Sequence, residues 1–344
     1  MKILGFFSVT FFIFSLSFRA FSDHHETTET EEVTKKFGLQ FDYDVSANYT
    51  DTKQADMDSV KTTVISQTGY LGATFTPVPD IIGTVYFNLF GDSSDNDNKR
   101  TEVAMVTYKH SELFSFSGGK NYLNFGGRDN MNWNYATIAV SPYTDMMGPF
   151  SASAPMMSGT VAAGIGAFTL MITDDIKEVE SKQPTALLEW NGSFGIFQPL
   201  LQLAPYNLGR SLQTSLSLGF DSNGYSGYLD VVVDARDAND NTTNYTNIVF
   251  ELNYSGSSLS PFLKVATFDT KQPTKDLKGN SSADKYDDNG MVALLGTNFN
   301  GVSQYFAPYL AVVSQSKKDL KAGSIDDTET LTMTSLIFGV GGSL

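Results

Sequence analysis

Three histidines are the side chains of this 344-residue sequence best suited to acid–base chemistry or metal binding near neutral pH. A hydrolase built on a β-scaffold needs such a histidine beside a serine or an aspartate. His110 is the one histidine beyond the amino-terminal region, and its dipeptide with Ser111 is typical of a tight turn between strands. We therefore expect no enzyme. If hydrolysis did occur, His110→Ala would abolish it.

The other two histidines could bind a metal at a newly exposed amino terminus. Residues 1–22 have the layout of a secretory signal peptide, with a lysine, an apolar run and a small-x-small triplet. The alternative, an uncleaved membrane anchor, needs about 20 apolar residues, more than this run offers. Cleavage before Asp23 would expose Asp23, His24 and His25, a sequence that can hold Cu(II) or Ni(II). The simpler interpretation is a solvated tail, so we expect no cofactor.

Composition narrows the class of protein further. The chain has no cysteine, a formal net charge of −15, 13% aromatic residues and 29 glycines. Such acidity excludes nucleic acid and favours neutral or cationic solutes as partners. The lack of cysteine favours a large bacterial envelope protein over a small disulfide-bonded one. Residues 23–36 are acidic and unpatterned, which predicts a disordered leader before a domain over 37–344.

Residues 37–344 repeat an alternating pattern of apolar and polar residues. Over 37–50 the odd positions are apolar or aromatic and nearly all even positions are polar, the period of a two-faced β-strand. The pattern predicts sixteen strands at 37–50, 62–76, 81–91, 100–109, 112–119, 156–164, 166–174, 185–192, 195–204, 211–221, 225–235, 245–254, 261–269, 289–299, 303–314 and 329–344. Pro199 and Pro308 fall inside two of them, so 14 or 12 strands remain possible.

The connections between these strands alternate in length. Short turns such as PVPD, GIG and DSNG are separated by longer polar stretches, among them 51–61, 91–100, 174–184, 234–244, 270–288 and 314–327. A sandwich has no reason for this alternation, whereas an outer-membrane barrel has short periplasmic turns and long external loops. The sequence therefore predicts an all-β, antiparallel transmembrane barrel whose apolar face meets lipid, with lipopolysaccharide and outer-membrane lipid as partners.

The connection over residues 120–155 differs from the other long ones, because it carries many large apolar side chains. Leaving them in water would be costly, and a loop that folds into the barrel buries them. We expect Tyr122, Trp133, Tyr143 and Phe150 to anchor this loop to the wall. We expect two carboxylates to face the water of the pathway, those of Asp129 and Asp145. The alternative is a loop over the barrel mouth or a subunit interface, with aspartates that only cap turns.

This loop resembles the third external loop of the general porins of Gram-negative bacteria. Its segment Tyr143-Thr144-Asp145-Met146 is similar to the aromatic-Thr-Asp-Met segment of those porins, and Gly118 to Tyr122 is similar to the sequence that leads into their loop. The resemblance implies a 16-stranded barrel, a loop that bends into the channel as a constriction, and a homotrimer. General porins set an acidic loop against a ladder of arginines on the wall.

The sequence departs from that pattern on the basic side. Its arginines after the signal peptide are Arg100, Arg128, Arg210 and Arg236, and none has clear inward parity near the loop. The basic candidates for the constriction are Arg128, Lys120 and Lys109, the last by alternation with Thr107, although Lys109 could equally lie at the periplasmic rim.

A second resemblance concerns the residues that lead into the same loop. Gly119-Lys120-x-Tyr122-x-x-Phe125-Gly126 resembles the strand-to-loop signature of substrate-specific porins, including a group that imports iron chelates. Taken together, the sequence predicts a passive channel of the Gram-negative outer membrane that prefers cations and admits small hydrophilic solutes. A substrate-selective channel and a plugged structural or adhesive barrel are the alternatives.

Overall fold

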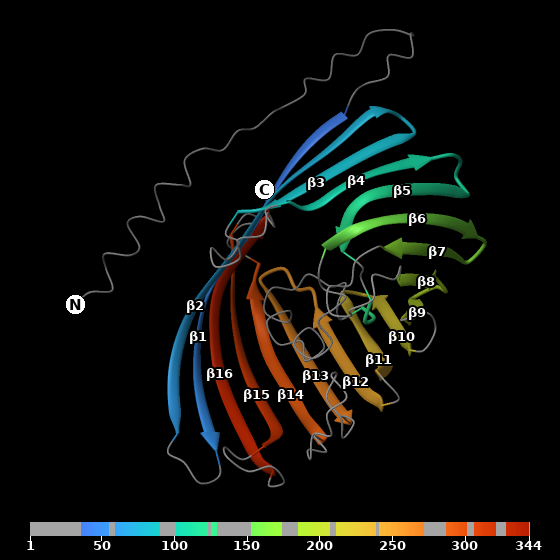
Figure 1. The fold of residues 1–344 in the computed structure, drawn as a ribbon. Helices are drawn as coiled ribbons and strands as arrows, with labels where there is room; N and C mark the ends of the chain where they lie inside the picture. The colour runs from blue at the N-terminus through green and yellow to red at the C-terminus, as the bar shows by residue number, and fades with distance from the viewer. Residues whose placement is uncertain are drawn as a thin grey trace. The chain divides into compact units, whose positions relative to one another are not determined.

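Sixteen β-strands form a single closed antiparallel barrel in the computed structural model (Figure 1), in which every strand pairs with its neighbours in sequence and β1 pairs with β16. The structure describes residues 36–54, 59–89, 101–122, 125–128, 153–173, 185–206, 211–238, 241–271, 287–300, 306–320 and 328–343. No helix in these ranges is long and apolar enough to cross a membrane. The all-β antiparallel barrel and the count of sixteen strands predicted from the sequence are confirmed.

The first eight strands are β1 (Lys36–Gln54), β2 (Val60–Val78), β3 (Ile81–Asn88), β4 (Thr101–Lys109), β5 (Phe114–Tyr122), β6 (Ser153–Ala163), β7 (Gly166–Thr173) and β8 (Thr185–Gly192). The second eight are β9 (Phe197–Tyr206), β10 (Ser211–Ser222), β11 (Tyr225–Ala238), β12 (Asn241–Tyr254), β13 (Leu259–Lys271), β14 (Asp287–Phe299), β15 (Ala307–Leu320) and β16 (Thr328–Ser343).

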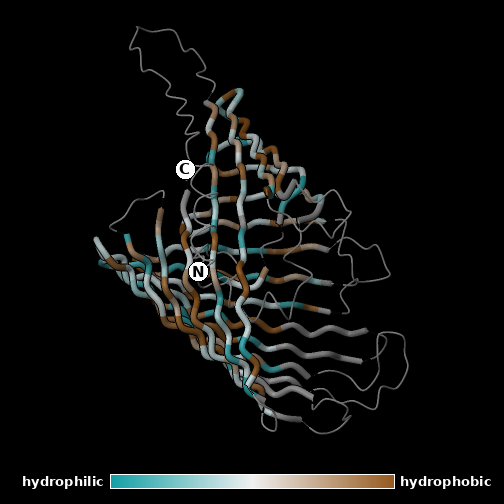
Figure 2. Tube along the Cα trace, turned by 90° about the vertical axis from the view of Figure 1, so that its left-hand side faces the viewer, coloured by the Kyte–Doolittle hydropathy of each residue, from teal (hydrophilic) through white to brown (hydrophobic). Residues whose placement is uncertain are grey.

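The alternation of the sequence becomes the two faces of the barrel wall. In β1, Val45 and Tyr49 are 40% and 44% exposed, and the register sets Tyr49 opposite Leu336 of β16, which is 48% exposed. Asp44 and Ile337 lie on the other face of the same two strands and are buried. Hydrophobic and hydrophilic residues follow one another along the strands in Figure 2. The exposed apolar face is the outer one, as a barrel in lipid requires.

Aromatic side chains gather on this outer face where short turns join the strands. Trp190 of β8 lies 6.4 Å from Phe168 of β7, between ring centroids, and 6.2 Å from Phe194 in the turn after β8. Tyr225 and Tyr254, paired across β11 and β12, are 4.8 Å apart. Aromatic rings at the ends of membrane strands are typical of the boundary between lipid and water. This end of the barrel, where the short turns lie, therefore corresponds to one membrane surface.

The prolines inside strands do not interrupt the barrel, because each lies just beyond one of its two ladders. Pro199 pairs with Leu218 of β10, while the ladder between β8 and β9 stops at Leu200. Pro308 pairs with Val340 of β16, while the ladder between β14 and β15 stops at Tyr309. The missing N–H therefore removes no bond from the second ladder, and the smaller strand counts are excluded.

Two of the predicted long connections are wrong, and a third, 314–327, is shorter than predicted because β15 continues to Leu320. Strands β1 and β2 continue into the stretch 51–61 and leave only 55–59 between them, and β11 and β12 continue through 234–244 up to the pair Ala238 and Asn241. These stretches are polar on both faces, so their sequence shows no alternation. Beyond the lipid a strand can be wet on both sides and still be held by its ladder, which is why hydropathy alone did not reveal them.

Candidate functional site: the inner wall and an inserted segment

The inner wall of the barrel divides into a buried half and an accessible half. Along β8 to β16, each strand turns at least one fully buried side chain inward, with exposed fractions of 0–4%, namely Leu187, Leu200, Ser217, Tyr228, Val249, Phe262, Leu294, Tyr309 and Ile337. The register places all of these on the face opposite the exposed apolar side chains. Water therefore has little access to this half of the wall.

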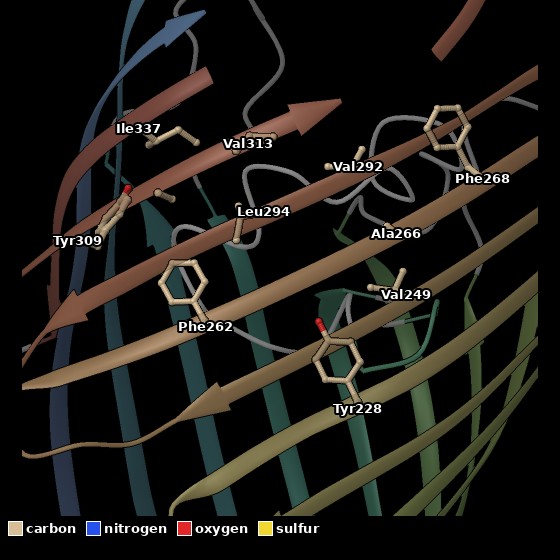
Figure 3. Packing of buried hydrophobic residues seen from close by; sticks show 11 residues of the cluster. Tyr228, Val249, Phe262, Ala266, Phe268, Val292, Leu294, Tyr309, Val313 and Ile337 are labelled. Carbon is tan, nitrogen blue, oxygen red and sulfur yellow. The ribbon is translucent and has the colours of Figure 1, made fainter. Parts of the chain in front are cut away.

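Eleven of the inward residues of β11 to β16 form one apolar cluster (Figure 3). Rings from β11, β13 and β15, those of Tyr228, Phe262 and Tyr309, lie among aliphatic side chains that include Val292 and Leu294. Two polar bonds border the cluster: Tyr228 donates to Glu251 at 2.6 Å, and Tyr309 donates to Asp44 at 2.9 Å. An inner wall of this kind is a packing surface and not the lining of a water-filled pore.

The inner wall from β1 to β7 is polar and mostly half-exposed. Hydroxyl groups dominate it, and each strand contributes at least one, as in Ser46, Thr74, Thr84, Thr107, Ser117, Thr160 and Thr169. Hydroxyls meet across strands at 2.8 Å between Thr107 and Ser117 and at 3.0 Å between Thr160 and Thr169. Among the described side chains of this half, the inward charged groups are Asp42, Asp44 and Lys109. Water inside the barrel therefore contacts the protein mainly along this half of the wall.

The segment Phe125–Arg128, just after β5, is inserted against the buried half of the wall. Phe125 is 0% exposed and packs in a cluster with Met156, Leu187, Ala204 and Val232, which come from β6, β8, β9 and β11. The chain thus leaves β5 and crosses to strands far around the barrel. The inward course predicted for the long connection is confirmed for these described residues.

A single glutamine receives the backbone of the inserted segment. The Oε1 atom of Gln202 accepts hydrogen bonds from the amides of Gly126 and Gly127, at 3.1 and 3.0 Å, and its Nε2 donates to Glu189 at 2.9 Å. Gln202 is 0% exposed. One side chain therefore satisfies two buried amides and one buried carboxylate, which fixes the height of the segment on β8 and β9.

Arg128 completes the attachment. Its Nε and one terminal nitrogen donate to the carbonyl oxygen of Gln198 at 3.1 and 2.6 Å. Burial lowers the pKa of the guanidinium, while the carboxylates of Asp230 and Glu189 raise it. An arginine stays protonated under all ordinary conditions, so the inserted segment brings a fixed positive charge to a wall that carries two carboxylates.

Glycine is required where the segment touches the wall. Gly127 has a φ of 78°, and a Cβ placed there would lie 2.6 Å from the nearer carboxylate oxygen of Asp230. A Cβ at Gly219 of β10 would lie 2.5 Å from Nε of Arg128. Both positions therefore bring backbone against a charged group at a distance that a larger residue would prevent.

The predicted basic residues lie in three different places. Arg128 is in the inserted segment. Lys109 shares the inward face with Thr107 but is the last residue of β4. Its backbone amide donates to the backbone carbonyl of Asp80 in the turn after β2, which puts it at the rim. Lys120 pairs with Ala104 and lies on the outward face of β5, with Phe116. The structure thus brings only Arg128 to the interior.

The remaining predicted site residues stay predictions. The carboxylates of Asp129 and Asp145, and the anchors Trp133, Tyr143 and Phe150, lie outside the described residues, as does the amino-terminal sequence Asp23, His24 and His25. Tyr122 ends β5, and its side chain is not among those described. His110 lies in the exposed turn before β5, with Nδ1 3.5 Å from the Tyr108 hydroxyl. Within the described ranges no group of three or more acidic or histidine side chains could hold a metal ion.

Sequence reasoning missed the residues that hold the segment. Glu189 and Asp230 stand within otherwise apolar strand sequences, TALLEW and YLDVVV, at the parity that points inward. A charge in mid-strand at that parity is the signal that could have found them. Gln202 carries no such signal, because its role depends on the glycines of a segment far away in the sequence.

Comparison with known proteins places this geometry among solved barrels. No protein-family model matches the chain, and no curated protein sequence matches it. Solved structures do match, at low identity. An anion-selective porin from Comamonas acidovorans has 13% identity and a TM-score of 0.63, and the alignment covers 90% of this chain and 100% of that one. The outer membrane channel DcaP of Acinetobacter baumannii has 14% identity and a TM-score of 0.60, with 91% and 99% covered.

A third match is OmpT, an outer membrane protein of Vibrio cholerae, with 13% identity, a TM-score of 0.59, and 91% and 100% of the two chains covered. At such low sequence identity, the matches show a shared fold and do not indicate which solute this chain would bind or pass. The outer-membrane location predicted from the sequence agrees with these matches and with the closed barrel. The chain therefore has the β-barrel fold of the porins of the Gram-negative outer membrane.

Proposed function

We propose that the protein is a passive channel for small hydrophilic solutes across the outer membrane. The observation that supports it most is the divided inner wall, in which a polar, accessible half from β1 to β7 faces a half that packs apolar side chains and the inserted segment. Water and solutes would pass along the polar half. The test is single-channel conductance of the purified protein in a planar bilayer.

We propose further that the channel prefers cations. Among the described side chains of the accessible half, Asp42 is a half-exposed acidic group and its neighbour Asp44 is buried, against Lys109 at the rim. Net charge is −15, and acidic residues prevail in external stretches such as 174–184. Charges at a narrow mouth with low-dielectric walls enrich counter-ions, and the effect weakens as salt screens them. A reversal potential measured across a salt gradient tests this proposal.

The constriction in this proposal is formed by the connection after β5, whose first residues are the inserted segment. Asp129 and Asp145 would present charge to the pathway, with Tyr122, Trp133, Tyr143 and Phe150 as anchors. Lys109 and Lys120 take no part in it, given their positions. Deleting residues 130–147 should raise single-channel conductance, since the narrowest part dominates the resistance. Asp145→Asn should lower cation preference at nearly constant conductance, because charge is lost and volume is kept.

One observation favours a second function, a structural barrel with a closed lumen: most of the described inward side chains of β8 to β16 are buried. A folded protein that never conducts would support this second function. A channel selective for one nutrient would instead conduct and lose current when that nutrient binds.

The remaining proposals concern processing and assembly. They are cleavage of residues 1–22 as a signal peptide, a homotrimer, and contact with lipopolysaccharide at the external rim. One of the matched structures of the Vibrio cholerae OmpT is described as a trimer. Mass spectrometry of the mature amino terminus and light scattering of the protein in detergent test the first two.

A further inference from the structure

A chain of hydrogen bonds joins three side chains on the accessible half of the wall. Tyr86 of β3 donates from its hydroxyl to Oε1 of Gln40 in β1, at 3.0 Å, and Nε2 of Gln40 donates to Asp42 at 2.7 Å. Strand β2 lies between β1 and β3, and its residue Gly72 pairs with Gln40 on one side and with Tyr86 on the other. Tyr86 therefore spans a whole strand to reach its acceptor.

Gly72 makes that span possible. A Cβ at position 72 would lie 2.4 Å from the ring of Tyr86, so the ring lies over the backbone of β2 where no side chain intervenes. Tyr86 is half-buried and Gln40 is exposed. The ring therefore has one side against the wall and offers accessible apolar surface beside an amide and a carboxylate.

Among the described side chains, the neighbours of this group carry no positive charge, and Asp44, on the same face as Asp42, is buried and accepts from Tyr309. The row next to Gln40, Gly72 and Tyr86 contains Thr74 and Thr84, paired with one another. On the other side the register brings Tyr70 next to Asn88 and Asp42. A solute held here meets hydroxyls, amides and aromatic rings, with Asp42 as the charge in the group, so an anion finds no counter-charge among the described side chains nearby.

We infer that Tyr86, Gln40 and Asp42 form a binding site for neutral, hydroxyl-rich solutes of the sugar class. Sugars combine a C–H face, which packs on an aromatic ring, with hydroxyls that both donate and accept. The ring of Tyr86 supplies the first contact, and the amide of Gln40 with the carboxylate of Asp42 supplies partners for the second. This inference rests on the proposed channel, because the site lies on the wall that the pathway would follow.

The test measures binding and conduction separately. Titration of the full-length protein in detergent with maltotriose, a neutral trisaccharide, gives affinity by calorimetry, and the same sugar is added during single-channel recording. We expect saturable binding and brief current interruptions. Tyr86→Ala should weaken binding at least about tenfold, and Gln40→Ala and Tyr86→Phe should each weaken it about fivefold, the effect of one lost hydrogen bond.

Two controls test whether a loss of sugar binding comes from the site itself. Tyr49→Ala removes a tyrosine from the outer face, where it is 44% exposed, and should leave sugar affinity unchanged. Each variant must keep the gel mobility of an unboiled barrel. Sugar binding without conduction would refute the channel and leave the site standing. Conduction without saturable sugar binding, equal affinity in Tyr86→Ala, or preference for an organic cation of similar size would overturn the site.

Discussion

Replacing Gln202 with leucine should release the inserted segment from the wall. The substitution keeps much of the side-chain volume and removes the acceptor of two buried amides and the donor to Glu189. A buried amide left without a partner costs about 1–3 kcal/mol, so the two together cost about 2–6 kcal/mol. At 1.4 kcal/mol per factor of ten, the attached state loses about 30-fold to 20,000-fold in population relative to the released state.

Trypsin reports this release directly, because the segment ends in Arg128. In the wild-type protein the bonds from Arg128 to the carbonyl of Gln198 hold the cleavage site against the wall. In Gln202→Leu, mass spectrometry of a brief digest should find peptides that end at residue 128. The matched control is Gln67→Leu, on an exposed part of β2. Equal protection of Arg128 in the wild type and in Gln202→Leu, with the barrel intact in both, would refute the attachment described above.

Three further substitutions test other contacts. Gly127→Ala should lower the midpoint of denaturant unfolding, since the φ of 78° at Gly127 and the nearby carboxylate both exclude a Cβ. The control is Gly118→Ala, which should leave the midpoint unchanged because nothing lies within 4 Å of the added Cβ. Tyr309→Phe removes the donor to the buried Asp44 and should cost about 1–3 kcal/mol of unfolding free energy, measured by denaturant titration in lipid. Phe125→Ala should also raise trypsin cleavage after residue 128, because emptying a fully buried phenylalanine site costs about 3–5 kcal/mol. Unchanged cleavage would mean that packing of Phe125 does not hold the inserted segment to the wall.

The strands were predictable because a barrel wall has two different faces. Stretches such as 211–221 alternate with Thr214 as the exception on the apolar face, and contact with lipid on one side of the wall requires such an alternation. The same reasoning fails beyond the lipid, where β11 and β12 continue with polar side chains on both faces. It also misjudged Pro199 and Pro308, since a sequence does not show where a ladder ends.

The interior was predictable only in outline. An apolar connection after β5 had to fold inward, and Phe125 does. The charge pattern of the general porins, an acidic loop against a basic wall, is reversed in the described part of this chain: Arg128 comes from the loop, and Glu189 and Asp230 come from the wall. That outcome depends on which strands the segment reaches across the barrel, and no local pattern in the sequence encodes this distance.

A reversal-potential measurement in a planar bilayer, under a KCl gradient of about tenfold, shows whether the barrel conducts and which ion it prefers. We expect discrete conductance steps and a reversal potential of the sign set by K⁺. The potential should move toward zero as the salt concentration on both sides is raised, because the Debye length falls from about 10 Å at 0.1 M to about 3 Å at 1 M. Steps with a reversal potential of the sign set by Cl⁻ would contradict the proposed cation preference. Protein that shows the gel mobility of a folded barrel and never conducts would contradict the channel itself.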